Sequence, residues 1–485
     1  MKYRLSKPFL FTVLPLTVLV IGLGFVILPR LKELENRPIP GEITFRTVKP
    51  EARPIATASV RKTSSSKSPM AWFGEKYENL MTWKRNPWKR PPGGFGDHYF
   101  ALRASKDPWD QAKSQELLRR SEAWYQKVLL RYPELAVAMK SIPDNQNGFL
   151  KWLDLSDRIK AANPDTSAGI TFPKELEDFF SQRAAWNANV ARDWIAKNRS
   201  LVDEIHAIGL MPERSVNGIP SERGVHISGL VHKNCGEIMF LEARLAAEHG
   251  DTAAALESVH AARGLADHLT EVETPTLLMS ILQALIQLSL ETHVLNDIIP
   301  ALPAGQVDLV AWEKTINPTV SQPTEFARIV KGEWHATVRH NLLPMLLDPE
   351  DPHIVPDAGE LIDHLALNTL EIVRLHETAT IRDLPTLDPL PAADTSHLSR
   401  TSSQLVETLS IGMGSSRKGW DRVQSVSAIT QAALSVMQGR AIPQDPVYGI
   451  DYRWEPRTRV LSMPAGKIFD ELNIKPITVP NVRSN

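Results

Sequence analysis

The chain has 485 residues, which exceeds the roughly 250 to 300 residues at which single hydrophobic cores stop growing, so two folded units or one large unit with appendages are expected. Charged residues make up 23% and apolar residues 42% of the sequence, which excludes a mainly disordered chain and a multi-span membrane protein. The 55 Lys and Arg residues nearly balance the 56 Asp and Glu residues. The net charge of the chain therefore does not favour nucleic acid or any other charged partner.

The first predicted element is a transmembrane helix at residues 9–28. This stretch, FLFTVLPLTVLVIGLGFVIL, carries no charge, and at about 1.5 Å per residue it spans roughly the 30 Å hydrocarbon layer of a bilayer. The apolar run continues into Leu28, Pro29 and Arg30 instead of ending in small residues. This favours an uncleaved signal-anchor, with a cleaved signal peptide as the alternative.

The orientation of this helix depends on the residues that flank it. Basic residues are nearly balanced on its two sides: Lys2, Arg4 and Lys7 before it, and Arg30, Lys32, Arg37 and Arg46 after it. The positive charges before the helix are concentrated within residues 1–8, which favours a cytoplasmic location for them. The long domain after the helix can cross the membrane largely regardless of its charge. We therefore expect a cytoplasmic head at residues 1–8 and a single-pass inner-membrane protein whose main domain is extracytoplasmic, in the periplasm.

Two irregular segments follow the predicted span. Residues 29–69 are rich in Pro, Ser, Thr and basic residues without apolar periodicity, which indicates a flexible tether. Residues 70–109 mix aromatic with basic side chains and are named here the collar. The collar either binds lipid or glycan or packs its aromatic rings between helices. Its prolines and glycines interrupt an amphipathic helix, which favours packing.

Residues 110–440 are predicted to form a helical domain, so the fold class is mainly α. Apolar spacing, caps and proline stops indicate successive helices, at residues 111–130, 149–162, 174–198, 324–347, 358–378 and 402–439. Residues 210–226 contain turn formers at many positions and are predicted to be a loop.

A helical hairpin is predicted around AEHGDTAAALESVHAAR, residues 246–262. Gly250 is placed to end the first helix in a left-handed conformation, and Asp251 is placed to cap the second. The hairpin resembles a tetratricopeptide unit in five of its residues: Ala243, Gly250, Asp251, Ala255 and Ala262. The later proline of that unit is replaced by Asp267, and no second copy follows at a 34-residue period. A corner of the helical core is therefore favoured over a binding repeat.

The next predicted helix begins with Thr274 as its cap and Pro275 as its first residue, and it is apolar around most of its circumference. Its polar stripe is narrow, at Ser280, Gln283 and Gln287. The strongly apolar run is about 14 residues, short of the roughly 17 to 25 of a membrane span, so a central buried helix is predicted. At the other end of the chain, residues 448–464 alternate around a turn at residues 455–457, so a β-hairpin followed by a tail is predicted within residues 441–485.

The sequence offers little evidence for a metal site. A di-iron bundle needs two Glu-x-x-His motifs and two further glutamates, and one such motif is present, at Glu257 and His260. Two more pairs are interpreted as solvated or hydrogen-bonded helix residues: His335 with His340, which an α-helix would place on different faces, and Glu360 with His364. His376 and Glu377 begin a zincin-like motif, but position 380 is a threonine.

Nucleophile and phosphate motifs are incomplete. GMGSSRKGW, residues 412–420, has glycines but not the Gly-Lys-Ser/Thr ending of a phosphate loop, and is interpreted as a flexible break in a long helical region. The single cysteine, Cys235, excludes an intramolecular disulfide and is expected to be a small buried side chain. No catalytic, cofactor-binding or metal-binding residue is predicted, and no cofactor.

Several segments together resemble a group of uncharacterised bacterial single-span, mainly helical envelope proteins. The resemblance covers residues 140–460 and rests on IPDNQNGFLKWL, LEARLAAEHGDTAAALESVHAARGLADHL, TPTLL and DPVYGIDYRW. These are packing motifs, and the resemblance implies no activity and no catalytic residues.

The function expected from these features is that of a membrane-anchored extracytoplasmic scaffold or binding protein without catalytic activity. Its partners would be the membrane, through residues 9–28, and a protein of the cell envelope, but not nucleic acid. Two alternatives stay open: an envelope hydrolase with a cleft of carboxylates and histidines, and a protein that associates with lipid or glycan through the collar at residues 70–109.

Overall fold

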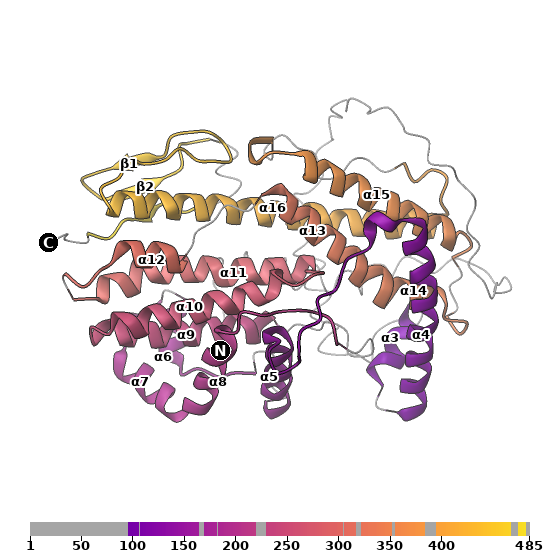
Figure 1. Ribbon diagram of the computed structural model, residues 1–485, viewed down its shortest axis with the longest axis horizontal. Helices are drawn as coiled ribbons and strands as arrows, with labels where there is room; N and C mark the ends of the chain where they lie inside the picture. Colours follow the sequence, from indigo (N-terminus) through magenta and orange to yellow (C-terminus); the bar gives the residue numbers. More distant parts are fainter. Residues whose placement is uncertain are drawn as a thin grey trace, which may run out of the picture. The chain divides into compact units, whose positions relative to one another are not determined.

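The computed structural model describes residues 96–105, 107–163, 169–181, 183–219, 229–303, 305–316, 322–351, 355–383, 394–466 and 474–481. The predicted transmembrane helix, the tether and residues 70–95 of the collar lie outside these ranges. The described part is mainly helical, with fourteen α-helices and a small three-stranded sheet (Figure 1). The mainly α fold class is therefore confirmed.

The described residues group into two compact units. The first contains described residues within 96–125, 341–367 and 393–412, and the second contains those within 126–340, 368–392 and 413–481. Three α-helices contribute residues to both units: α4 (Pro108–Arg131), α15 (Ala358–Thr378) and α16 (Arg400–Met437). The π-helix η6 (His335–Leu342) does so as well.

The first unit is built on α3 (Asp97–Ala104), α14 (Leu343–Leu346) and parts of the three shared helices. Helix α3 lies within the collar, where no helix was predicted. Its Tyr99 side chain is fully buried, and Gly96 before it has a φ of 79° and lies against Met345. Tyr99 thus packs inside the fold, as the packing interpretation of the collar expects.

The second unit begins with short helices: η3 (Pro133–Leu135), α5 (Gly148–Ala162), α6 (Lys174–Phe180), α7 (Ala188–Lys197) and α8 (Arg199–Gly209). The single helix predicted over residues 174–198 is wrong, because the chain leaves the helix after Phe180 and begins α7 at Ala188. Asn187 explains the restart, since its side chain accepts a hydrogen bond from the Val190 backbone N–H, as an N-cap does.

The predicted hairpin is confirmed. Helix α9 (Gly229–Glu248) ends before Gly250, whose φ is 74°, and α10 (Thr252–Thr270) begins after Asp251. The Asp251 carboxylate accepts from the Ala254 N–H at 3.0 Å. Figure 1 shows α9, α10 and α11 (Leu277–His293) side by side, with α10 in contact with the other two and with α8.

Glycines let α8 and α10 approach each other at backbone distance. A Cβ on Gly264 of α10 would lie 1.8 Å from the Gly209 carbonyl oxygen, and a Cβ on Gly209 would lie 2.4 Å from the Ala261 carbonyl oxygen. His268 fastens the same crossing, because its Nε2 lies 2.8 Å from the Ile208 carbonyl oxygen. Small residues thus place the end of α10 against the end of α8.

Helix α11 begins two residues later than predicted. Thr276, and not Thr274, is its N-cap, since Thr276 Oγ1 accepts from the Met279 N–H at 3.2 Å. The buried Glu333 carboxylate accepts from the Leu277 N–H at 2.9 Å. The segment continues into a π-helix, η4 (Val294–Ile298), and a 3-10 turn, η5 (Ile299–Ala301). Among the described residues, Leu277–Ala301 alone is long and apolar enough to cross a membrane, and 61% of its most apolar window is buried in the fold.

The remaining helices are α12 (Leu309–Ile316), α13 (Pro323–Trp334), the π-helix η6 (His335–Leu342), η7 (Ile381–Asp383), and α15 and α16. The flexible break predicted at residues 412–420 is wrong, because α16 runs through it without interruption. Glycine costs only about 1 kcal/mol in a helix interior. The buried side chains of Arg417 and Trp420 on either side of Gly419 hold this part of α16 in the second unit.

The predicted C-terminal hairpin is also confirmed. Strand β1 (Arg453–Glu455) pairs antiparallel with β2 (Val460–Ser462), with Trp454 opposite Leu461. A third strand, β3 (Ile477–Thr478), was not predicted and pairs antiparallel with β2. Sheet residues belong to the same hydrophobic cluster as α9, α10 and α16, which is how so small a sheet is stabilised.

Candidate functional site

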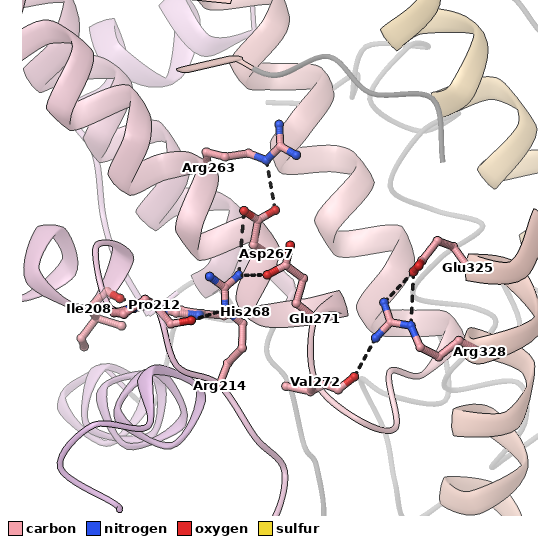
Figure 2. Close-up of polar contacts among 10 residues, drawn as sticks. All are labelled: Ile208, Pro212, Arg214, Arg263, Asp267, His268, Glu271, Val272, Glu325 and Arg328. Carbon is pink, nitrogen blue, oxygen red and sulfur yellow. Dashed lines mark hydrogen bonds and ion pairs between the residues drawn. The ribbon is translucent and has the colours of Figure 1, made fainter. Parts of the chain in front are cut away.

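Charged side chains gather at the C-terminal end of α10. Figure 2 shows Asp267 and Glu271 beside Arg214, with Arg263 paired to Asp267. It also shows Arg328 nearby, paired to Glu325 and to the Val272 carbonyl. Arg263 and Asp267 belong to α10 itself, Glu271 follows its last residue, Arg214 lies in the segment after α8, and Arg328 lies on α13. We call these five residues the α10 charged end.

The guanidinium groups of this cluster face its carboxylates and nearby carbonyls. Arg214 Nη1 lies 2.7 Å from Glu271 Oε2 and 3.8 Å from Asp267 Oδ2. Arg263 Nε donates to Asp267 Oδ1 at 3.0 Å. Arg328 Nη1 donates to the Val272 carbonyl at 2.8 Å, just beyond the helix end, and its other nitrogens pair with Glu325.

The two carboxylates stand where helix electrostatics oppose them. The C-terminal end of a helix carries partial negative charge and favours cations, and like charges four residues apart on a helix repel each other. Asp267 and Glu271 violate both preferences. Three arginines supply the compensating charge, one from α10 itself and two from other segments.

Burial and charge shift the pKa values in this cluster. Partial burial, and then the neighbouring Asp267, raise the pKa of the half-exposed Glu271 carboxyl, although three arginines act to lower it. Burial lowers the pKa of His268 to about 4, and the charge of Arg214 acts in the same direction. His268 is therefore neutral at neutral pH, and the positive charge at this end of α10 comes from its arginines.

Glu273 holds the segment that carries Arg214. Its carboxylate accepts from Ser215 Oγ at 2.6 Å, the Val216 N–H at 3.0 Å and the Lys140 N–H at 2.9 Å. Burial would raise the pKa of Glu273, but these hydrogen bonds prevail and lower it. The loop after α8 is thus fixed next to the α10 charged end by an ionised carboxylate.

A histidine in the first unit lies between two carboxylates. His98 Nδ1 lies 2.7 Å from Asp348 Oδ2, and its Nε2 lies 3.3 Å from Glu350 Oε2. Asp351 accepts from the Gly96 N–H at 2.6 Å. A carboxylate that orients a histidine is a feature of general-base sites, but here the second ring nitrogen also faces a carboxylate. This arrangement fastens the start of α3 to the acidic loop at residues 348–351.

A buried arginine lies in the second unit beside His376. Arg417 donates to His376 Nε2, and its Nε pairs with Asp421 Oδ1 at 2.8 Å. Its guanidinium lies over the Phe326 and Trp420 rings, at 5.4 and 5.6 Å from their centroids. Burial, together with the charge of Arg417, lowers the pKa of His376 to about 4. His376 therefore accepts a hydrogen bond inside the core, far from the zincin role considered from the sequence.

The other residue pairs considered from the sequence lie on α10 and α15. Glu257 and His260 are exposed on α10. His364 lies 5.4 Å from His397, measured between ring centroids, and its pKa is lowered by burial. In the described part of the chain, no group of three or more His, Cys, Asp or Glu side chains could hold a metal ion.

His335 and His340 lie in the π-helix η6 and not in the α-helix assumed from the sequence. Its i to i+5 hydrogen bonds bring residues five apart closer to one face than an α-helix does. His335 Nε2 lies 2.8 Å from the Leu135 carbonyl oxygen. Cys235 is fully buried, as predicted, and burial raises the pKa of its thiol.

The α10 charged end was missed in the sequence because its members come from segments far apart in the chain. The one local signal was available: two acidic residues, Asp267 and Glu271, stand at the end of a helix that favours cations there. In comparisons with known proteins, the chain matches no family model, no curated protein and no solved structure.

Proposed function

We propose that the chain is a membrane-anchored helical binding protein without catalytic activity, whose partner-binding surface is the α10 charged end. In this proposal residues 9–28 form the anchor and the main domain lies outside the cytoplasm. The observation that carries the binding surface is the ion pair between Arg214 and Glu271, together with the charges of Arg263 and Arg328, which also act to lower the pKa of Glu271. Residues that break the local charge preferences of a helix, as Asp267 and Glu271 do, are expected at functional sites.

The partner is an acidic protein segment that takes the place of Glu271 at Arg214. The Glu271 side chain is 56% exposed and can turn into solvent, whereas Arg214 is 12% exposed and remains in place. Arg214 Nε donates a hydrogen bond to the Pro212 carbonyl oxygen at 3.3 Å, which restrains the arginine side chain. A partner carboxylate would replace the Arg214–Glu271 ion pair with an ion pair between Arg214 and the partner. The Arg214 guanidinium is partly desolvated, so such a pair contributes more there than in bulk water.

The binding surface is tested with the full-length protein in detergent and two fluorescent peptides of equal length, one rich in glutamate and one rich in lysine. We expect the glutamate-rich peptide to bind, and added salt to weaken the binding. Arg214→Gln should weaken it about tenfold, the effect of one lost charge-assisted contact of roughly 1.4 kcal/mol. Glu271→Gln should strengthen it, because the internal competitor loses its charge.

The matched control is Arg199→Gln on α8. Arg199 also pairs with two carboxylates, Asp203 and Glu242, but lies outside the α10 charged end. This substitution should leave peptide binding unchanged. Equal weakening by Arg199→Gln and Arg214→Gln, or no binding to the Glu271→Gln protein, would reject the surface.

The anchor and its orientation are tested separately with reporters fused to the two ends of the full chain. A C-terminal reporter that works only outside the cytoplasm, together with co-flotation of the chain with membranes, is the expected result. A C-terminal reporter active only in the cytosol would reverse the topology. Loss of flotation on replacing three leucines of residues 9–28 with lysine would locate the anchor there.

A further inference from the structure

A polar seam joins α11 and α16 inside the second unit. Its members are buried: Glu291 is 1% exposed, Gln287 4% and Ser427 0%. Gln283 Nε2 donates to Gln287 Oε1 at 2.7 Å, and Gln287 Nε2 in turn lies 3.0 Å from Glu291 Oε1 and 2.9 Å from Ser427 Oγ. The polar stripe expected on α11 from the sequence therefore faces another helix and ends in a carboxyl group.

The two oxygens of Glu291 are in different environments. Oε1 accepts from Ser427 Oγ at 2.8 Å and from Gln287 Nε2. Oε2 is buried and receives no hydrogen bond. A carboxylate would need donors at both oxygens, whereas a carboxylic acid has one oxygen that accepts and one hydroxyl that donates. The hydrogen bonds around Glu291 therefore fit a neutral carboxylic acid better than a carboxylate.

The charged surroundings of Glu291 agree with a neutral acid. From α10, Arg263 is the charged group that acts on it, and Arg263 already pairs with Asp267 and with the Ile316 carbonyl. From α16, the neighbours that act on the carboxyl are the hydroxyls of Ser427 and Thr430. Burial raises the pKa of Glu291 more than these partners lower it.

We propose that Glu291 is a neutral carboxylic acid in the folded protein, and that this protonated state stabilises the packing of α11 against α16. A proton that leaves Oε2 goes to solvent base and leaves a negative charge on a side chain that is only 1% exposed. An unmet buried charge is far more costly than an unmet neutral polar group. The α11–α16 packing therefore loosens when Glu291 ionises.

The sign of the pH dependence follows from the raised pKa. The folded state holds this proton more tightly than the unfolded state, whose glutamate titrates near its ordinary value of 4.5. The stabilisation is fully present below that value and is lost as pH rises through the pKa of the folded state. Other groups also titrate in alkali, so the measurement must be a difference between the wild-type chain and a variant.

The test uses the full-length protein and Glu291→Gln, whose amide is neutral at every pH and keeps one acceptor and one donor. Infrared spectra at neutral pH should show a protonated carboxyl band that is absent from the variant. As pH rises, the wild-type Tm should fall by at least about 2 °C more than the Tm of the variant. Glu257→Gln, on an exposed position of α10, should keep both the band and the wild-type slope.

Two further variants test whether the infrared band belongs to Glu291. Glu333 is a second buried acid whose pKa burial raises, so the Glu333→Gln spectrum separates its band from that of Glu291. If Glu291→Gln does not fold, Ser427→Ala removes one hydrogen bond to Oε1 and should shift the Glu291 band to higher frequency. An unchanged spectrum in Glu291→Gln or in Ser427→Ala, or an equal pH slope in Glu291→Gln and wild type, would overturn the proposal.

Discussion

Gly264 is the residue at which the α8–α10 crossing is most sensitive. An added Cβ would meet the Gly209 carbonyl oxygen at 1.8 Å, and backbone atoms cannot rotate away as a side chain can. Gly264→Ala should therefore destabilise the protein by about 1 to 3 kcal/mol or more, measured by urea unfolding. Gly236→Ala on α9 is the control, because its Cβ would meet only the Ile286 side chain, at 3.3 Å. Equal stability of the two variants would contradict the close approach.

His268 makes the same crossing sensitive to acid. Its pKa in the folded protein is about 4, below the 6.5 of an ordinary histidine. The unfolded chain therefore binds its proton first, and the stabilisation, full above pH 6.5, is lost as pH falls through about 4. The loss amounts to roughly 3 kcal/mol. Urea midpoints across this range should fall less steeply in His268→Gln than in wild type, whereas His260→Gln, at an exposed position, should follow wild type.

At the scale of single elements, the Asp251 cap defines where α10 begins. Its carboxylate accepts from the Ala254 N–H at 3.0 Å, one of the donors that a helix start leaves without a partner. Asp251→Ala should cost about 1 kcal/mol of stability, whereas Asp251→Asn keeps an acceptor and should cost a few tenths. Thermal unfolding of the two variants measures the difference. A loss of equal size in both would show that charge, not capping, is what Asp251 contributes.

Elements with strong local signals were predictable from the sequence. The α9–α10 hairpin and the β1–β2 hairpin each combine a periodic apolar pattern with turn or cap residues, so local and tertiary preferences agree. Where they disagreed, the prediction was wrong. Residues 174–198 have one helical period, but the Asn187 cap divides them. The glycines of residues 412–420 indicate a break, but buried neighbours such as Arg417 keep α16 helical.

The candidate site was much less predictable than the elements. Arg214 and Glu271 lie in segments separated by two helices, and no spacing along the chain indicates that they meet. The polar stripe of α11 was visible, yet its partner Ser427 lies on α16, so its burial could not be inferred. Ion pairs and buried networks depend on which helix packs against which, and apolar periodicity gives only the face of each helix that is buried.

At the scale of the whole molecule, the two units are made from alternating stretches of one chain. Each unit draws on at least three separate stretches, and α4, α15 and α16 each continue from one unit into the other. A cut in any one stretch therefore removes residues from a core that the rest of the chain must complete. This organisation differs from a string of independent domains, each of which could be removed without harm to the others.

The C-terminal segment gives the sharpest test of this organisation. Four of its side chains, Tyr452, Leu461, Met463 and Val479, are buried in the same cluster as residues of α9, α10 and α16. Burial of a large apolar side chain contributes about 1.5 to 3 kcal/mol, so together they contribute roughly 6 to 12 kcal/mol. That is comparable with the roughly 5 to 15 kcal/mol by which a domain is stable.

A chain ending at residue 440 should therefore lose cooperative thermal unfolding and become sensitive to limited proteolysis throughout α9 and α10. Arg457→Ala, at an exposed turn position, should leave both measurements unchanged. Cooperative unfolding of the shortened chain at the wild-type Tm would show instead that the helical core is complete without the sheet.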